Sequence, residues 1–163
     1  MIKNNKFEEI ISYKLPKRGD IVIFRYPMGK KKPKKRPCLV ISVNEISHCI
    51  KVAYGTSNLS HSANPAAFEV KQDSVDFIYT GLACATVFEM NKIAYFPYNS
   101  SFFVIPNRSK DNTPLIGRLP SRYDEKMKKG LEIAKKIMAA KENKRVKRKK
   151  LAKKAAKEDI TRR

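Results

Sequence analysis

The chain has 163 residues, enough for one domain with a hydrophobic core. Its 36 Lys and Arg residues against 15 Asp and Glu give a formal net charge of +21, which indicates an anionic partner such as nucleic acid, a membrane surface or an acidic protein. No window approaches the roughly 18 consecutive apolar residues of a membrane-spanning helix, and charges interrupt any N-terminal signal-peptide pattern. We therefore expect a cytoplasmic protein that does not enter a membrane.

Short β-like runs follow a polar N-terminal arm, residues 1–16. Alternating or continuous apolar residues, separated by clusters of Pro, Gly, Asn and Ser, are typical of short strands joined by turns. In chain order the predicted strands are DIVIFRY (20–26), PCLVISV (37–43), CIKVAYGT (49–56), AAFEVK (66–71) and GLACATVFEM (81–90), followed by a hairpin of KIAYFPY (92–98) and SFFVIP (101–106).

The hydrophobic period changes after Pro120. Ser121 stands three residues before Asp124, which predicts a capping box at the start of a helix. The packing face of this helix is predicted to contain Met127, Leu131, Ala134 and Met138, which recur at helical spacing. Residues 139–163 have high helix propensity but no continuous apolar stripe, so we expect a basic tail, helical or disordered, that is either a solvated charge run or a nucleic-acid contact.

These elements predict a mainly β fold with a terminal helix: a small SH3-like barrel plus a basic C-terminal helical extension. The expected organisation is an N-terminal arm over residues 1–16, a barrel domain with its helix over 17–138, and the tail over 139–163. Each cysteine lies in an apolar run without a C-x-x-C pair, which favours reduced core thiols and no metal site; the three are Cys38, Cys49 and Cys84.

A run of basic residues, KKKPKKR, stands directly before the second predicted strand and is expected to lie in the loop that joins the first two strands. Its last residue, Arg36, precedes Pro37, and a residue before proline is held in an extended conformation. An arginine fixed at this point can present its planar fork of donors to a phosphate. The less specific phosphate contacts expected from this region are Lys30, Lys31, Lys32, Lys34 and Lys35, together with Arg25 and Lys51.

Hydroxyl groups end the third predicted strand in the stretch YGTSN, residues 54–58. Thr56 and Ser57 could bind a ligand there, although a Thr-Ser pair after a strand is also typical of a simple turn. His61 follows in the next loop, where it could reach a substrate near Thr56 or could be an ordinary surface residue.

The succession KRGDIVIFRYP, KRPCLVIS, GTS, FEV, GLACATVFEMNKI and IGRLPSRYDEKMKKGLEIA, over roughly residues 17–138, resembles the MazF/PemK family of toxin endoribonucleases from toxin–antitoxin pairs. The resemblance implies an SH3-like barrel that forms a homodimer and cuts single-stranded RNA, often messenger RNA, without a metal or other cofactor. The family arginine of the RP pair corresponds to Arg36 and the family threonine to Thr56, with Ser57 and His61 as auxiliary candidates.

What the resemblance implies is a growth-inhibiting toxin that an acidic antitoxin protein silences. The RNA 2′-hydroxyl would attack its own phosphate to give a 2′,3′-cyclic phosphate and a 5′-hydroxyl end, and a fixed guanidinium would stabilise the charge that develops. The alternative is a non-catalytic nucleic-acid-binding module on the same barrel. A membrane-surface role for the tail lacks a Trp or Phe anchor in residues 139–163.

Overall fold

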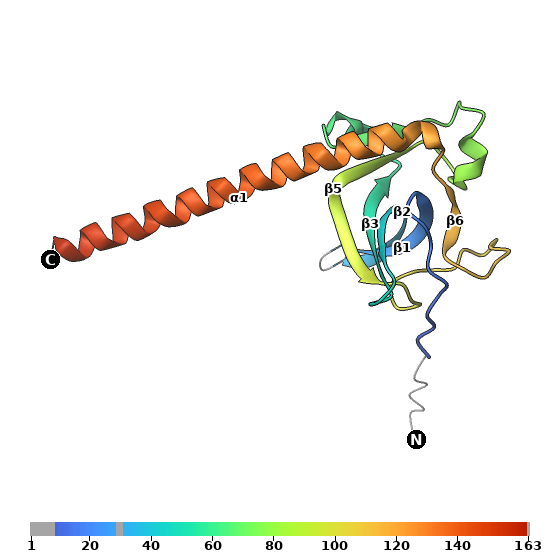
Figure 1. Cartoon of the computed structure of the whole chain (residues 1–163), viewed down its shortest axis with the longest axis horizontal. Coiled ribbons are helices and arrows are strands. Elements are labelled where there is room, and N and C mark those ends of the chain that lie inside the picture. The colour runs from blue at the N-terminus through green and yellow to red at the C-terminus, as the bar shows by residue number, and fades with distance from the viewer. Residues whose placement is uncertain (1–8, 29–30, 163) are drawn as a thin grey trace, which may run out of the picture.

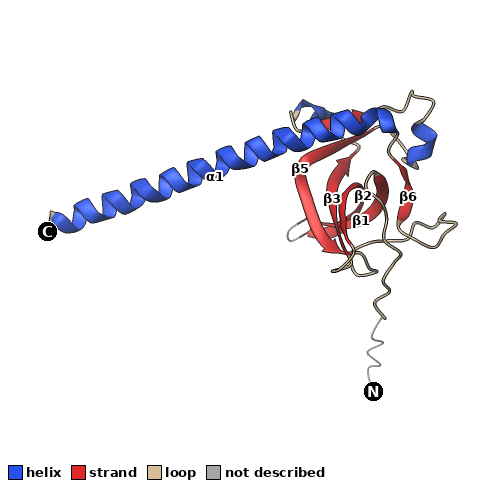
Figure 2. Cartoon of the chain, in the orientation of Figure 1, coloured by secondary structure: helices blue, strands red, loops and turns tan. Residues whose placement is uncertain are grey.

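The computed structural model describes residues 9–28 and 31–162. Six strands form one antiparallel sheet in the order β4-β5-β3-β2-β1-β6, and the sheet curls into a half-barrel with a long helix across one end (Figures 1 and 2). The strands are β1 (Asp20–Met28), β2 (Lys31–Asn44), β3 (Cys49–Thr56), β4 (Ala67–Val70), β5 (Thr86–Pro97) and β6 (Leu115–Arg118). This architecture confirms the predicted mainly β small barrel with a terminal helix.

Irregular strand pairing bends the sheet. The register shifts between Val40 and Ser42 where β2 meets β3, and again between Ala53 and Tyr54 where β3 meets β5. Such bulges increase the local twist and let a strand turn a corner. Strand β5 uses this bend to pair with β4 over its first residues and with β3 along its length, so that one long strand links the two parts of the curved sheet.

The two faces of the sheet carry separate hydrophobic cores, because successive side chains of a strand point to opposite faces. Ile21 and Leu39 belong to the first core, whereas their neighbours Val22 and Cys38 belong to the second. The first core also contains Ala53, Phe88 and Met90 and is covered by the helix. The second core also contains Val40, Ile50, Val52, Tyr98 and Phe103.

The N-terminal segment closes the second core. Tyr13 packs edge-on against Tyr98, with ring centroids 5.6 Å apart, and Tyr98 packs in the same way against Phe103. A backbone hydrogen bond from the Tyr13 N–H to the Tyr98 carbonyl, 3.2 Å long, ties this segment to the chain after β5. Burial raises the pKa of the Tyr98 hydroxyl above its ordinary value, as expected for a phenol enclosed by apolar side chains.

The helix α1 (Asp124–Thr161) follows a 3-10 turn, η3 (Ser121–Tyr123). Its first part covers the first core through Met127 and Ala134, and Gly130 lets the helix come close: a Cβ at Gly130 would lie 2.7 Å from Cγ of Met90. The second part has no contact with the barrel and projects far beyond it (Figure 1). Within the described residues, no helix has an apolar stretch long enough to span a membrane.

Several local predictions were wrong. The basic run does not lie in a loop, because β2 already begins at Lys31 and carries the lysines along a strand. The stretch 101–106 forms no hairpin strand and only bridges β1 through Phe103 and Phe24. Strand β5 begins at Thr86, so residues 81–85 are not part of it.

Three side-chain predictions also need correction. No capping box forms, since neither η3 nor α1 has a side-chain cap hydrogen bond. Met138 is 64% exposed and does not pack, because the barrel ends before it. Cys84 is exposed and Cys49 half-buried, so only Cys38 is a core thiol, and burial raises its pKa to about 12.

Candidate functional site

Arg36 lies inside β2, directly opposite Phe24 of β1. Its side chain is half-buried, and its Nε is a buried donor without a hydrogen-bond partner among the described residues. A buried donor that has lost water without gaining an acceptor costs free energy, so such a group needs a reason. An anionic ligand that accepts from the guanidinium would supply the missing acceptor.

Thr56 is the last residue of β3. The pairing of Cys38 with Tyr54, continued by two residues, brings Thr56 across from Arg36 on the same face of the sheet. Thr56 is only 4% exposed, and its Oγ1 accepts a hydrogen bond from the Asn58 N–H at 3.1 Å. The structure therefore brings the two predicted residues opposite each other on neighbouring strands, with the threonine hydroxyl also shaping the turn that follows.

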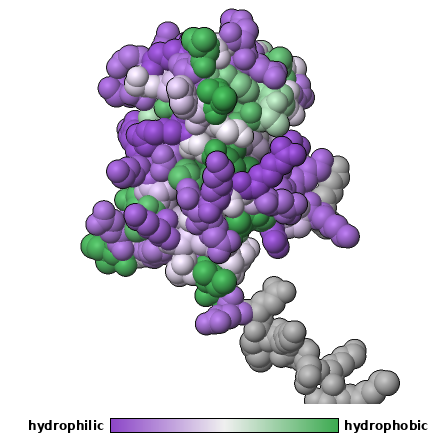
Figure 3. Space-filling view, turned by 90° about the vertical axis from the view of Figure 1, so that its right-hand side faces the viewer, coloured by the Kyte–Doolittle hydropathy of each residue, from purple (hydrophilic) through white to green (hydrophobic). Residues whose placement is uncertain are grey.

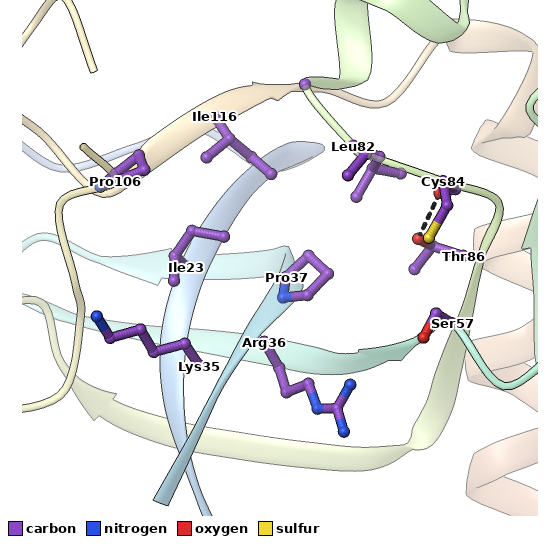
Figure 4. Close-up of a pocket in the computed structure, with 12 residues that line it drawn as sticks. Ile23, Lys35, Arg36, Pro37, Ser57, Leu82, Cys84, Thr86, Pro106 and Ile116 are labelled. Atoms are coloured by element: carbon purple, nitrogen blue, oxygen red, sulfur yellow. Dashed lines mark hydrogen bonds between the residues drawn. The ribbon is translucent and has the colours of Figure 1, made fainter. Parts of the chain in front are cut away.

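A pocket opens beside Arg36 and the end of β3 (Figure 4). Apolar side chains, among them Ile23, Leu82 and Ile116, form much of its lining, and Lys35, Arg36 and Ser57 contribute polar groups. None of the described residues that line it is acidic. Such a lining, apolar with cations and a hydroxyl and no carboxylate, suits an anion that carries an apolar ring.

Lys35 and Arg36 extend from β2 in different directions, as strand alternation requires (Figure 4). Arg36 is directed away from Pro106 and Ile116, whereas the Ser57 hydroxyl points to the side of the pocket where the guanidinium lies. Unlike the buried Thr56, Ser57 is exposed. Ser57 is therefore the more accessible of the two hydroxyl groups.

Only some of the cations predicted to bind phosphate lie close together. Arg25 and Lys35 face each other directly across β1 and β2, and like charges in this position repel each other unless an anion lies between them. Lys32 and Lys34 are exposed on the same strand, Lys31 begins it, and Lys30 lies outside the described residues. Lys51 is exposed five residues before Thr56 along β3, roughly 17 Å away, so it does not belong to this group.

A second polar cluster, which the sequence analysis missed, holds His61. The His61 Nδ1 lies 3.1 Å from Oε2 of Glu89, a buried residue of β5 that pairs with Tyr54. Lys92 Nζ lies 3.0 Å from the same oxygen, and the Asn64 amide donates to Oε1 at 3.3 Å. His61 thus has one ring nitrogen fixed, in the 3-10 turn η1 (Leu59–Ala63) that follows the end of β3.

Two opposing effects set the pKa of Glu89. Burial raises the pKa of its carboxyl, but the contacts with Lys92, His61 and Asn64 outweigh burial and hold this pKa below its ordinary value. The carboxylate is therefore charged at neutral pH. The available signal in the sequence was an acid inside the apolar run TVFEM, with a lysine three residues later.

This cluster makes stability depend on pH. Because the pKa of Glu89 is lower in the folded than in the unfolded chain, its stabilisation is present above the unfolded value of about 4.3 and is lost as the pH falls through the folded value. We expect Glu89→Gln to flatten this acid limb of the unfolding free energy, measured by urea unfolding between about pH 3 and 7. If the free energies of unfolding of the wild type and the variant changed in parallel with pH, the prediction would be wrong.

His48 makes a structural contact with the N-terminal segment. The His48 Nε2 contacts the Tyr13 carbonyl oxygen at 2.7 Å, in the turn between β2 and β3. Among the described residues, no group of three or more His, Cys, Asp or Glu side chains is arranged to hold a metal ion.

The structure is a small basic half-barrel in which Arg36 of β2 and the Ser57 hydroxyl that follows β3 line one pocket. Residues 17–133 match the family described as PemK-like, MazF-like toxin of type II toxin-antitoxin system. This match covers most of the chain, so the chain belongs to that family. A comparison with curated proteins finds no match. The family match confirms the resemblance seen in the sequence, and with it a toxin that works with an antitoxin.

Proposed function

We propose that the chain is an endoribonuclease that cleaves single-stranded RNA, messenger RNA included, without a metal cofactor, and that it inhibits growth in this way. The observation that carries the proposal is the buried Nε of Arg36, a donor without an acceptor at the end of a pocket with no acidic lining residue. A phosphodiester oxygen is the acceptor that fits this donor. The apolar pocket walls would then lie against a base or ribose beside that phosphate.

The reaction follows from these groups. The RNA 2′-oxygen attacks the adjacent phosphorus and loses its proton, the bond to the 5′-oxygen breaks, and that oxygen takes up a proton. Negative charge grows on the non-bridging oxygens, where the guanidinium of Arg36 stabilises it. Ser57 supplies an accessible hydroxyl to hold the phosphate, and Thr56 fixes the turn that positions Ser57. The Arg25 and Lys35 pair binds a neighbouring phosphate.

Proton transfer needs a group other than Arg36, because a guanidinium stays protonated at neutral pH. His61 is the candidate for this role: Glu89 contacts its Nδ1 and leaves Nε2 to exchange a proton. This role resembles that of other histidines oriented by a carboxylate. We expect His61→Gln to change the shape of the pH profile of cleavage, measured as the single-turnover rate against pH, and not only the rate.

The partners proposed here follow from charge and family. A net charge of +21 suits an acidic antitoxin that covers the cationic pocket and keeps RNA out. A homodimer and a cytoplasmic location are the further expectations for a toxin of this family that acts on messenger RNA.

RNA digestion tests the function directly. Single-stranded RNA is incubated with the protein and an excess of chelator, and the ends of the products are analysed. We expect fragments with 5′-hydroxyl and 2′,3′-cyclic phosphate ends, because the internal 2′-oxygen is the nucleophile. Intact RNA that is nonetheless bound tightly would contradict the proposal and identify a non-catalytic nucleic-acid-binding module instead.

A further inference from the structure

The distal part of α1 is an exposed, basic rod. We call residues 139–161 the basic arm; all of them are exposed, and together they carry ten Lys and Arg residues against three Asp and Glu. Figure 1 shows the arm leaving the barrel as a straight continuation of the helix. Figure 3 views the molecule from the right-hand side of Figure 1, opposite to the arm, and shows a mostly hydrophilic barrel surface with separate hydrophobic spots. The arm adds nothing to either hydrophobic core.

Such a segment is poorly stabilised by its own contacts. Within the described arm, one short contact joins opposite charges, the 3.5 Å ion pair of Arg145 with Glu142, and both side chains are mostly exposed. A helix that is polar on all sides normally needs many such pairs or a partner. The excess positive charges repel one another along the rod, so a bound polyanion would stabilise the helix.

Part of this charge is ordered into a stripe. Five basic side chains line one shallow groove along the arm: Lys141, Lys144, Arg145, Arg148 and Lys149. Their spacing of 3, 4, 7 and 8 residues from the first places them on one face of the helix. On a helix this stripe spans about 12 Å, at 1.5 Å per residue. Several phosphates of one nucleic-acid backbone can therefore meet it together.

The apolar residues of the arm argue against a protein partner. Val146, Leu151 and Ile160 are exposed, but they form no stripe: Leu151 lies on a different side of the helix from Val146 and Ile160, and these two are separated along the axis by about 21 Å, at 1.5 Å per residue. Protein interfaces need an apolar centre, and binding of this arm to a protein helix would need an apolar stripe. The arm offers charge alone, which is what a phosphate backbone requires.

We propose that the basic arm is a second RNA-binding surface, which holds the phosphate backbone outside the segment in the pocket without regard to sequence. That the ligand is RNA rests on the proposed function. A long RNA then contacts both the pocket and the arm, whereas a short RNA contacts the pocket alone. It lies outside residues 17–133, which match the toxin family, so this surface is an addition to the family barrel.

The test compares two variants of the full chain with equal net charge. The arm variant replaces four basic residues with glutamine: Lys141, Lys144, Arg148 and Lys149. The control variant replaces four lysines of the first part of the same helix with glutamine: Lys128, Lys129, Lys135 and Lys136. Fluorescence anisotropy measures binding of 2′-O-methyl RNA, which cannot be cleaved because its 2′-oxygen is blocked. One RNA has about eight nucleotides and the other several times that length, so that only the longer can reach beyond a single binding site.

We expect the arm variant to bind the long RNA at least tenfold more weakly. The negative slope of log K against log salt should become shallower by about 3, for four lost single-strand contacts. Binding of the short RNA should stay within twofold, and the control variant should bind both RNAs like the wild type. Circular dichroism checks that both variants keep their helix.

Three outcomes would overturn the inference. Equal weakening by the control variant would show that only total charge matters. Unchanged binding of long RNA would exclude the arm as an RNA surface. Loss of binding to an acidic polypeptide, with RNA binding intact, would assign the arm to a protein. Failure of the proposed function would be distinguishable from these three outcomes. In that case the wild type would cut no RNA, while the arm variant would still bind RNA more weakly than the wild type does.

Discussion

Replacing Arg36 with lysine should remove most RNA cleavage while the barrel still folds. Lysine keeps the positive charge but has neither the planar fork of donors nor the Nε that lies buried without an acceptor. Removal of one well-placed donor to a developing oxyanion typically lowers kcat by about 10² to 10³. The measurement is the single-turnover cleavage rate of a saturating RNA, with thermal unfolding as the check on folding.

Lys35→Gln is the matched control for this prediction. Lys35 is the neighbouring residue of the same strand, is exposed, and extends in a different direction from Arg36 (Figure 4). Its loss should weaken RNA binding and the salt dependence of binding, and it should leave the rate at saturation within about tenfold. If Arg36→Lys cleaved as fast as the wild type, the guanidinium would have no role in the chemical step.

Gly55→Ala should be among the most destabilising single changes in the chain. A Cβ at this position would overlap the carbonyl oxygen of Pro37 in the backbone of β2 and would lie 2.9 Å from Cε1 of Phe88 in the first core. Neither neighbour can yield easily, because one is strand backbone and the other a fully buried ring. Overpacking of this kind costs about 1–3 kcal/mol, and two such contacts place Gly55 at the upper end.

Urea unfolding of Gly55→Ala measures this effect through the transition midpoint. Ser42→Ala, an exposed change on β2, is the control and should leave the free energy of unfolding within about 0.5 kcal/mol of the wild type. Gly55→Ala should also lose cleavage activity even where the protein remains folded, because Gly55 lets β3 lie close against β2 between Arg36 and Thr56. A midpoint equal to that of the control would mean that the strands separate at little cost.

Hydrophobic patterning was sufficient to predict the barrel and the helix. Runs such as PCLVISV and CIKVAYGT read as strands because alternate residues fill the two opposite cores. The helix face was predicted through Met127 and Ala134, and it failed at Met138, since nothing in a periodic pattern shows where the barrel beneath a helix ends.

The basic run was placed wrongly for a physical reason. Lysines and proline are rare in central strands, so KKPKKR reads as a loop, yet β1 and β2 pair over this stretch as an exposed ribbon that suits charged side chains. The cluster around Glu89 was missed because it forms from segments far apart in the sequence, β5 and η1, and no local pattern links them.

The two opposite cores give the toxin a built-in order of assembly during its synthesis. The second core is complete once Phe103 has been made, whereas the first core still lacks Tyr123, Met127 and Ala134. Because these three residues follow Phe103 in the chain, the first core can close only after the residues of the second have been synthesised. The face of the sheet that α1 covers would thus stay open to solvent after the opposite face has folded, and the toxin fold is incomplete until α1 has been made.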